Sequence, residues 1–298
     1  MSSSTGIFST ASIVIHFVEK YLMHERFSYN PRGYFLSVIL STTLLWSLGG
    51  YMSFSPVWAD FYMLPMLLGL MMPSCFAVVF IWRLPEPGMR RDFIRRALSF
   101  QLIRPWVFIG SLALMPLSVL VAITLSLFLG GSSEQFIVSD AFSFDTGFVP
   151  VLALLFLAAV FEELGWRGYG FEGLERGRSF LSASLIFGVL WSLWHLPLLW
   201  VNDSYQYEIY SQNPWFAVNF FVGTALMGII VSWVFQLNNR SILATILFHF
   251  AINLSQETLS MTQETKCLQT LVLALSVLII ISNQWSLFSH KMDRTWYK

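Results

Sequence analysis

Charged residues are scarce in this sequence of 298 amino acids. Only 11% of the residues are Asp, Glu, Lys or Arg, while 56% are hydrophobic. Soluble domains usually carry about 25% charged residues, so the composition excludes an ordinary water-soluble fold. Basic and acidic residues are equal in number, at 17 each, and no excess of one sign indicates nucleic acid as a partner. The sequence therefore predicts a membrane protein surrounded by the lipid bilayer.

Cysteines, targeting signals and linkers are also few or absent. Cys75 and Cys267 lie in or beside apolar runs and form neither a disulfide framework nor a thiolate zinc pattern. The first residues, MSSSTGIFS, lack a basic segment and a cleavage site, so we expect no cleavable signal peptide. No internal repeat, low-complexity tract or linker divides the chain. We expect a single membrane domain over residues 1–298.

Long apolar runs predict an all-α, polytopic integral membrane protein with about eight transmembrane helices. A spanning helix needs about 20 mostly apolar residues. The fourth and seventh runs are shorter and polar, which a span tolerates when neighbouring helices shield it or it faces a cavity. Residues 7–23 are expected to form a helix in the membrane interface. The predicted spans are 33–52, 61–82, 105–129, 148–164, 181–201, 215–236, 241–255 and 268–289.

The basic residues predict the orientation of these spans, because Lys and Arg collect in cytoplasmic connections. With eight spans and both termini cytoplasmic, 16 of the 17 basic residues fall on the inner side, and Lys266 alone lies outside. This distribution indicates a multi-pass protein of the cell membrane, bacterial or archaeal; an endoplasmic reticulum protein would follow the same rule.

One inner connection, residues 83–104, reads RLPEPGMRRDFIRRALSFQLIR. Its apolar residues recur at helical spacing against a group of arginines. The pattern is typical of an anchor on the anionic inner leaflet; the alternative is a docking surface for a substrate.

The fourth span ends in a cluster of charged residues, FEELGWR. A charge near the centre of a spanning helix costs about 2.5–3.5 kcal/mol on insertion scales, so such residues are functional candidates. Glu163 and Arg167 are four residues apart and are expected to form an ion pair. Glu162 points about 100° away, has no expected partner in its own helix, and suits a general acid or base. The alternative is that all three mark the boundary with water.

Two further clusters place polar residues on later spans. His249 and Asn253 are four residues apart on one helical face, where they could stabilise an oxyanion or join helices through hydrogen bonds. His195 follows Trp191 by four residues, and Pro197 is expected to kink the helix near His195. Each polar group is expensive alone, and together they make sense if they converge on one site.

The three clusters resemble the CPBP family of intramembrane proteases, whose pattern is EExxxR, FxxxH and HxxxN on successive core helices. Here the motifs are EELGWR, WSLWH and HFAIN, with Trp191 in place of the usual Phe. The resemblance covers residues 148–255, which would be the catalytic core, and implies an intramembrane endopeptidase acting on membrane-associated or lipidated proteins. Eukaryotic members remove the last three residues of prenylated CAAX proteins.

The resemblance also implies the role of each residue. Glu162 and His195 would activate a water, while His249 and Asn253 would stabilise the oxyanion. Glu163, Arg167 and Trp191 would support the site.

The metal requirement and the reaction itself have alternatives. We expect no cofactor, although Glu162, His195 and His249 could in principle ligate zinc with one open position. A transporter could use the same polar residues as an ion relay, and a silent scaffold could keep them without activity.

The depth of Glu162 and His195 in the membrane raises a further question. His195 lies about 14 residues into the fifth span, so it can meet Glu162 only if the fourth span continues as helix past Gly165 or the fifth starts later than predicted.

Overall fold

The computed structural model describes residues 29–84, 87–139 and 150–291, and within these ranges it contains helices and no strands. The predicted interfacial helix at residues 7–23 lies outside the described residues. The all-α fold class is confirmed.

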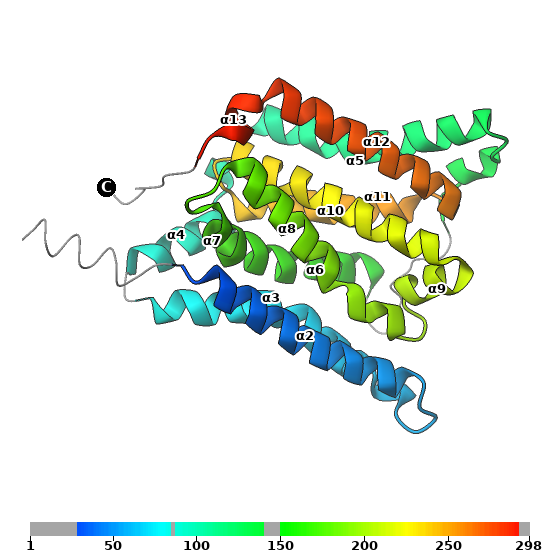
Figure 1. Ribbon diagram of the computed structural model, residues 1–298, viewed down its shortest axis with the longest axis horizontal. Coiled ribbons are helices and arrows are strands. Elements are labelled where there is room, and N and C mark those ends of the chain that lie inside the picture. Colours follow the sequence, from blue (N-terminus) through cyan, green and yellow to red (C-terminus); the bar gives the residue numbers. More distant parts are fainter. Residues whose placement is uncertain (1–28, 85–86, 140–149, 292–298) are drawn as a thin grey trace, which may run out of the picture.

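Each predicted span corresponds to a helix close to its expected bounds (Figure 1). These helices are α2 (Pro31–Ser53), α3 (Met63–Arg83), α5 (Pro105–Phe128), α6 (Val151–Gly165), α8 (Phe180–Trp194), α10 (Pro214–Leu237), α11 (Ile242–Thr258) and α12 (Gln263–Asn283). Short elements connect them: α4 (Pro87–Leu98), α7 (Phe171–Glu175), α9 (Tyr205–Gln212), α13 (Trp285–Ser289) and five single-turn helices.

Six segments of the described chain are long and apolar enough to cross a membrane, so the protein is polytopic. The other two helices, α6 and α11, are shorter than these six and pack against each other. Helix α6 also contacts α3, and α11 also contacts α5 and α10. The two polar helices are thus shielded by neighbours, as their sequences require. Eight crossings and cytoplasmic termini remain predictions.

Helical structure continues without a break from α6 beyond Gly165. A π-helical turn, Trp166–Gly170, joins it directly to α7, which ends at Glu175. Glu162 therefore lies about 20 Å above the end of α7, and His195 lies about 22 Å above the start of α8, at 1.5 Å per residue. The two residues reach the same depth, which answers the question raised by the sequence.

Close helix approach fixes the position of α6. A Cβ atom on Gly165 would clash with the backbone of Pro73 in α3, so only glycine fits at this crossing. Small residues at helix contacts let backbones approach closely in membrane proteins. This approach sets the rotation of α6, and with it the direction of Glu162 and Glu163.

Helix α4 is held by the protein more firmly than its sequence predicts. Arg96 is buried and donates hydrogen bonds to the carbonyls of Arg167 (3.2 Å) and Gly168 (3.3 Å) in the π-helical turn. Its guanidinium also pairs with Asp92 at 2.8 Å. Phe93 likewise faces the interior. The predicted lipid-facing stripe is therefore reduced to exposed residues such as Ile94 and Leu98.

The two ends of the bundle differ in character (Figure 1). Helices α4, α7 and α13 gather at one end, which carries the basic residues of the connections. Helix α9 and the turn after α2 lie at the opposite end. We refer to these as the basic end and the α9 end.

The Gly165 crossing predicts a large effect of one methyl group. We expect Gly165→Ala to lower the free energy of unfolding by about 1–3 kcal/mol, because overpacking forces α6 and α3 apart. Thermal unfolding in detergent measures this change. Gly110→Ala is the matched control, since a Cβ there meets nothing within 4 Å. Equal stability of the two variants would contradict the proposed close approach.

The charge distribution predicts which end faces the cytoplasm. In a cysteine-free background, we expect Val57→Cys at the α9 end to react with an impermeant maleimide in intact cells. Gly88→Cys at the basic end should react only after permeabilisation, because the basic end is expected inside. Both positions are exposed. The opposite labelling pattern would reverse the orientation.

Candidate active site

Two indole groups hold the Glu162 carboxylate. Its Oε2 atom accepts a hydrogen bond from Trp191 Nε1 at 2.7 Å and a longer one from Trp166 Nε1 at 3.4 Å. Glu162 is 5% exposed, and its exposed part lines a cavity. The carboxylate is therefore oriented by the protein while it remains accessible from the cavity.

These indole contacts differ from the sequence-based expectation. Glu162 was expected to have no partner in its own helix, whereas Trp166 lies one turn later and supplies one. Trp191 was expected to support the site, and it donates the shorter of the two hydrogen bonds to Glu162. A buried indole N–H usually finds an acceptor, and this rule is the signal that could have identified both donors.

His195 lies just beyond the end of α8, where the chain turns into the single-turn helix Leu196–Trp200. The α-helix ends before Pro197 and does not continue through a kink as predicted. His195 Nδ1 lies 2.8 Å from the carbonyl oxygen of Trp191. Because a carbonyl can only accept, Nδ1 carries the hydrogen, and Nε2 of the neutral ring keeps its lone pair.

Glu163 faces the protein interior, where it contacts two positively polarised groups. Arg167 Nη1 lies 3.3 Å from both carboxylate oxygens, which confirms the predicted ion pair. His249 Nδ1 donates to Glu163 Oε1 at 3.0 Å, a contact that the sequence did not predict. Glu163 therefore orients the imidazole of His249 as well as pairing with Arg167.

Arg167 is fully buried and ties α6 to α10. Its Nη2 atom donates to the carbonyl of Gly228 and to Ser232 Oγ, both at 3.4 Å. Its guanidinium carbon lies 4.0 Å from the centre of the Phe187 ring, a cation–π contact. The charge of Arg167 is thus compensated on several sides, which removes the cost of an isolated buried ion.

Asn253 lies one helical turn from His249 on α11, and both side chains line the same cavity as Glu162 and His195. Its Nδ2 atom donates to the carbonyl of Leu155 at 3.3 Å, so the amide is held against α6. An amide nitrogen carries two hydrogens, and one of them serves this contact. The structure thus brings all four predicted catalytic residues to one cavity.

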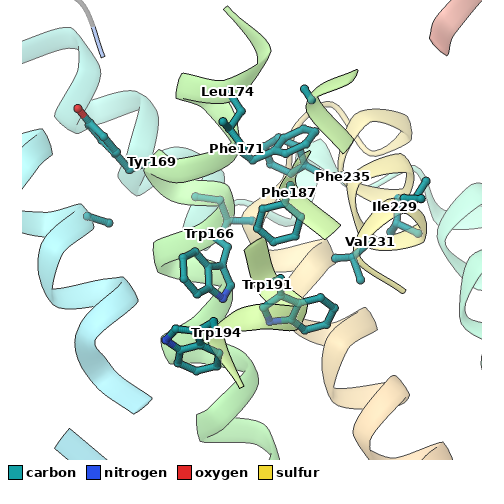
Figure 2. Close-up of a cluster of buried hydrophobic side chains, with 14 of the residues drawn as sticks. Trp166, Tyr169, Phe171, Leu174, Phe187, Trp191, Trp194, Ile229, Val231 and Phe235 are labelled. Atoms are coloured by element: carbon teal, nitrogen blue, oxygen red, sulfur yellow. The ribbon is translucent and has the colours of Figure 1, made fainter. Parts of the chain in front are cut away.

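Trp191 contacts both histidines and belongs to the buried aromatic cluster shown in Figure 2. Its ring makes edge contacts with His249 at 5.3 Å and with His195 at 5.9 Å between ring centres. Trp166 and Trp194 pack beside one another on the α6 side of this cluster (Figure 2).

The cavity has a volume of about 290 Å³ and extends from Glu162 to the α9 end. This volume is at the lower limit of about 300–1,000 Å³ for ligand pockets. One wall is apolar and comes mainly from α3 and α6; the opposite wall is polar and comes from α9 and α12. The apolar wall includes Met63, Met66, Leu67, Leu70, Leu154 and Leu155, and the polar wall includes Tyr205, Gln263, Lys266 and Gln269.

The sequence predicts no metal and offers Glu162, His195 and His249 only as an alternative set of zinc ligands. Across residues 29–84, 87–139 and 150–291, no group of three His, Cys, Asp or Glu side chains is placed to hold a metal ion. Glu162 and His249 are each engaged by protein hydrogen bonds.

The fold and the site define a polytopic α-helical membrane protein with a carboxylate, two histidines and an asparagine around one cavity. A family model described as Rce1-like, type II CAAX prenyl endopeptidase, matches residues 144–255. The chain is also 47% identical over 274 residues to CAAX prenyl protease 2 of Methanococcus maripaludis, covering 91% of this chain and 100% of that relative. The chain belongs to the Rce1-like family of CPBP proteases, as its three motifs predicted.

The Trp191 hydrogen bond predicts that Phe, the usual family residue, is a poor substitute in this chain. We expect Trp191→Phe to reduce the rate constant of the catalysed reaction roughly tenfold to a hundredfold, because a hydrogen bond to a charged group is worth about 1.5–3 kcal/mol. Steady-state kinetics of the purified protein measures the loss. Trp194→Phe is the matched control, since Trp194 Nε1 has no hydrogen-bond partner among the described residues. A larger loss in the control would show that ring size, not the hydrogen bond, matters.

Proposed function

We propose that the protein is an intramembrane endopeptidase that uses Glu162 and His195 to activate a water. The observation that carries this proposal is their common position. An oriented carboxylate and a histidine with a free Nε2 lone pair line one cavity at one depth in the bundle. Proton transfer by such positioned groups contributes about 10²–10⁴-fold to a reaction rate.

The reaction follows from the donors and acceptors at the cavity. A water between Glu162 and His195 Nε2 gives a proton to the carboxylate as its oxygen attacks the peptide carbonyl carbon. The carbonyl oxygen becomes an oxyanion, which Asn253 and His249 stabilise by donating hydrogen bonds. The proton then passes to the leaving amine, and the C–N bond breaks.

His249 can take this role only as a cation. Its Nδ1 hydrogen is donated to Glu163, so donation from Nε2 to the oxyanion requires a second proton on the ring. The Glu163 carboxylate is then the counter-charge of the imidazolium, while Arg167 holds the carboxylate in place. Glu163 and Arg167 are therefore positioning residues.

We propose a prenylated, membrane-associated protein as the substrate, cleaved close to its C-terminus. The support is the name of the Methanococcus maripaludis relative, CAAX prenyl protease 2, and the apolar cavity wall formed by α3 and α6, which suits a hydrocarbon chain. A prenyl group against that wall places the following peptide bonds beside Glu162.

We propose the cell membrane as the location. The expected orientation turns the cavity away from the cytoplasm, however, whereas a CAAX protein carries its tail at the cytoplasmic surface. The labelling pattern of Val57→Cys and Gly88→Cys decides from which side the substrate enters. Cleavage in detergent does not depend on orientation and tests the activity separately.

The activity test uses purified protein in detergent and a prenylated peptide that ends in a CAAX sequence. We expect the wild type to release the C-terminal tripeptide, detected by mass spectrometry, and Glu162→Gln to lose about 10²–10⁴-fold in rate because the amide cannot accept the proton. Glu134→Gln makes the same chemical change at an exposed position and is expected to keep wild-type activity.

Three results would contradict this proposal. Full activity of Glu162→Gln would remove the carboxylate from the mechanism. Activity that is lost on chelation and restored by zinc would show a metal-dependent reaction. Absence of cleavage by the folded wild type, with several prenylated and non-prenylated peptides, would favour the scaffold or ion-relay alternatives.

A further inference from the structure

A lysine on the polar wall of the cavity has no role in the reaction described above. Lys266, in the first turns of α12, donates from Nζ to the hydroxyl of Tyr205 at 3.1 Å. The same ammonium lies 4.5 Å from the centre of the Tyr205 ring. The Tyr205 hydroxyl in turn donates to Gln263 Oε1 at 3.1 Å. The ammonium group is thus held over the cavity by one side chain.

Lys266 differs from the other charged residues of the cavity lining, which are acidic. It is the only Lys or Arg among the residues that line the cavity. Asp203 and Glu257 line the same cavity. An ammonium has three hydrogens to donate, and Tyr205 takes one. The remaining donors suit an anionic group of a ligand.

The distance from Lys266 to the reaction centre can be counted along two antiparallel helices. Gln256 of α11 donates to Gln269 of α12 at 3.1 Å, which aligns the two helices. Asn253 is three residues below this contact and Lys266 three residues above it, so they differ by about 9 Å along the bundle axis. An extended tripeptide spans about 10 Å. The offset of Lys266 from Asn253 along the bundle axis is therefore close to the length of one extended tripeptide.

Aromatic contacts join the same two points. The Tyr205 ring contacts Phe220 at 6.0 Å between ring centres, and Phe220 contacts His195 at 5.7 Å. A line of aromatic contacts thus connects the side chain that holds the lysine with the proposed water-activating histidine.

We propose that Lys266 binds the C-terminal carboxylate of the substrate, and this inference rests on the proposed cleavage of a C-terminal tripeptide. The prenyl group lies against the apolar wall, the scissile bond lies beside Glu162, and the terminal carboxylate reaches the ammonium on the polar wall. By binding the terminal carboxylate, Lys266 would place the scissile bond three residues from the end of the substrate chain. It is a specificity-determining residue outside the three family motifs.

The test compares two prenylated peptides that differ only at the C-terminus, one with a free carboxylate and one with an amide. We expect wild-type kcat/KM to favour the carboxylate by roughly tenfold to a hundredfold, the range of one charge-assisted hydrogen bond. Lys266→Met should reduce this preference to near unity, mainly through a higher KM for the free acid. Lys266→Arg should keep most of the preference, because the charge remains.

Lys291→Met is the matched control, since it removes an exposed lysine at the basic end and should keep the wild-type preference. Equal cleavage of both peptides by the wild type would overturn the inference and leave the proposed function intact. A preference that persists in Lys266→Met would overturn it as well. Equal losses on both peptides in that variant would show a structural role only. No cleavage of either peptide by the folded wild type would overturn the proposed function, and the inference with it.

Discussion

The site depends on the interactions that the buried carboxylate of Glu163 makes with its two neighbours. It lies between Arg167 on its own helix and His249 on α11, and all three side chains are nearly or completely inaccessible. Removing one member of a buried ion pair leaves an uncompensated charge, which costs about 3–5 kcal/mol. The group therefore fixes the relative rotation of α6 and α11, while Arg167 adds α10 through Gly228 and Ser232. This buried contact therefore sets the positions of the cavity residues.

Helix geometry divides the work between the two adjacent glutamates. Consecutive side chains point about 100° apart, so once Glu163 faces the interior, Glu162 must face elsewhere. The close approach of Gly165 to Pro73 and the π-helical turn after it turn Glu162 toward the cavity. There the carboxylate meets indole donors that leave it accessible. One glutamate is thus structural and the other is available for chemistry, although they differ by a single position.

The sequence could predict the helices and the converging polar residues because both depend on local composition. Apolar runs of sufficient length specify α2, α3, α5, α10 and α12, and an expensive polar group such as Glu162 or His249 stands out within an apolar helix. Contacts set by tertiary packing could not be predicted in this way. The donation from Trp191 to Glu162 joins residues 29 positions apart, and the burial of Arg96 depends on carbonyls of the π-helical turn. The cavity wall around Lys266 likewise needs α9 and α12 to be placed together.

The position of the cavity makes orientation part of the mechanism. Glu162 lies about 20 Å from the basic end and about 13 Å from the end of α11, counted at 1.5 Å per residue. The residues that line the cavity extend from Glu162 to the α9 end, so we expect substrate and water to enter from that end. An enzyme whose basic end faces the cytoplasm would therefore cut a chain presented at the outer surface. An enzyme that cuts a cytoplasmic CAAX tail must instead carry nearly all its basic residues outside, against the usual rule.

Some of these basic residues contribute little to the charge difference between the two sides of the membrane, because Arg96, Arg167 and Arg240 are paired with buried acids. The exposed Arg91 and Arg95 of α4 are part of the remaining bias, together with the exposed Arg32, Arg83, Arg104 and Arg176 of other segments, so orientation depends on which leaflet this end of the bundle meets.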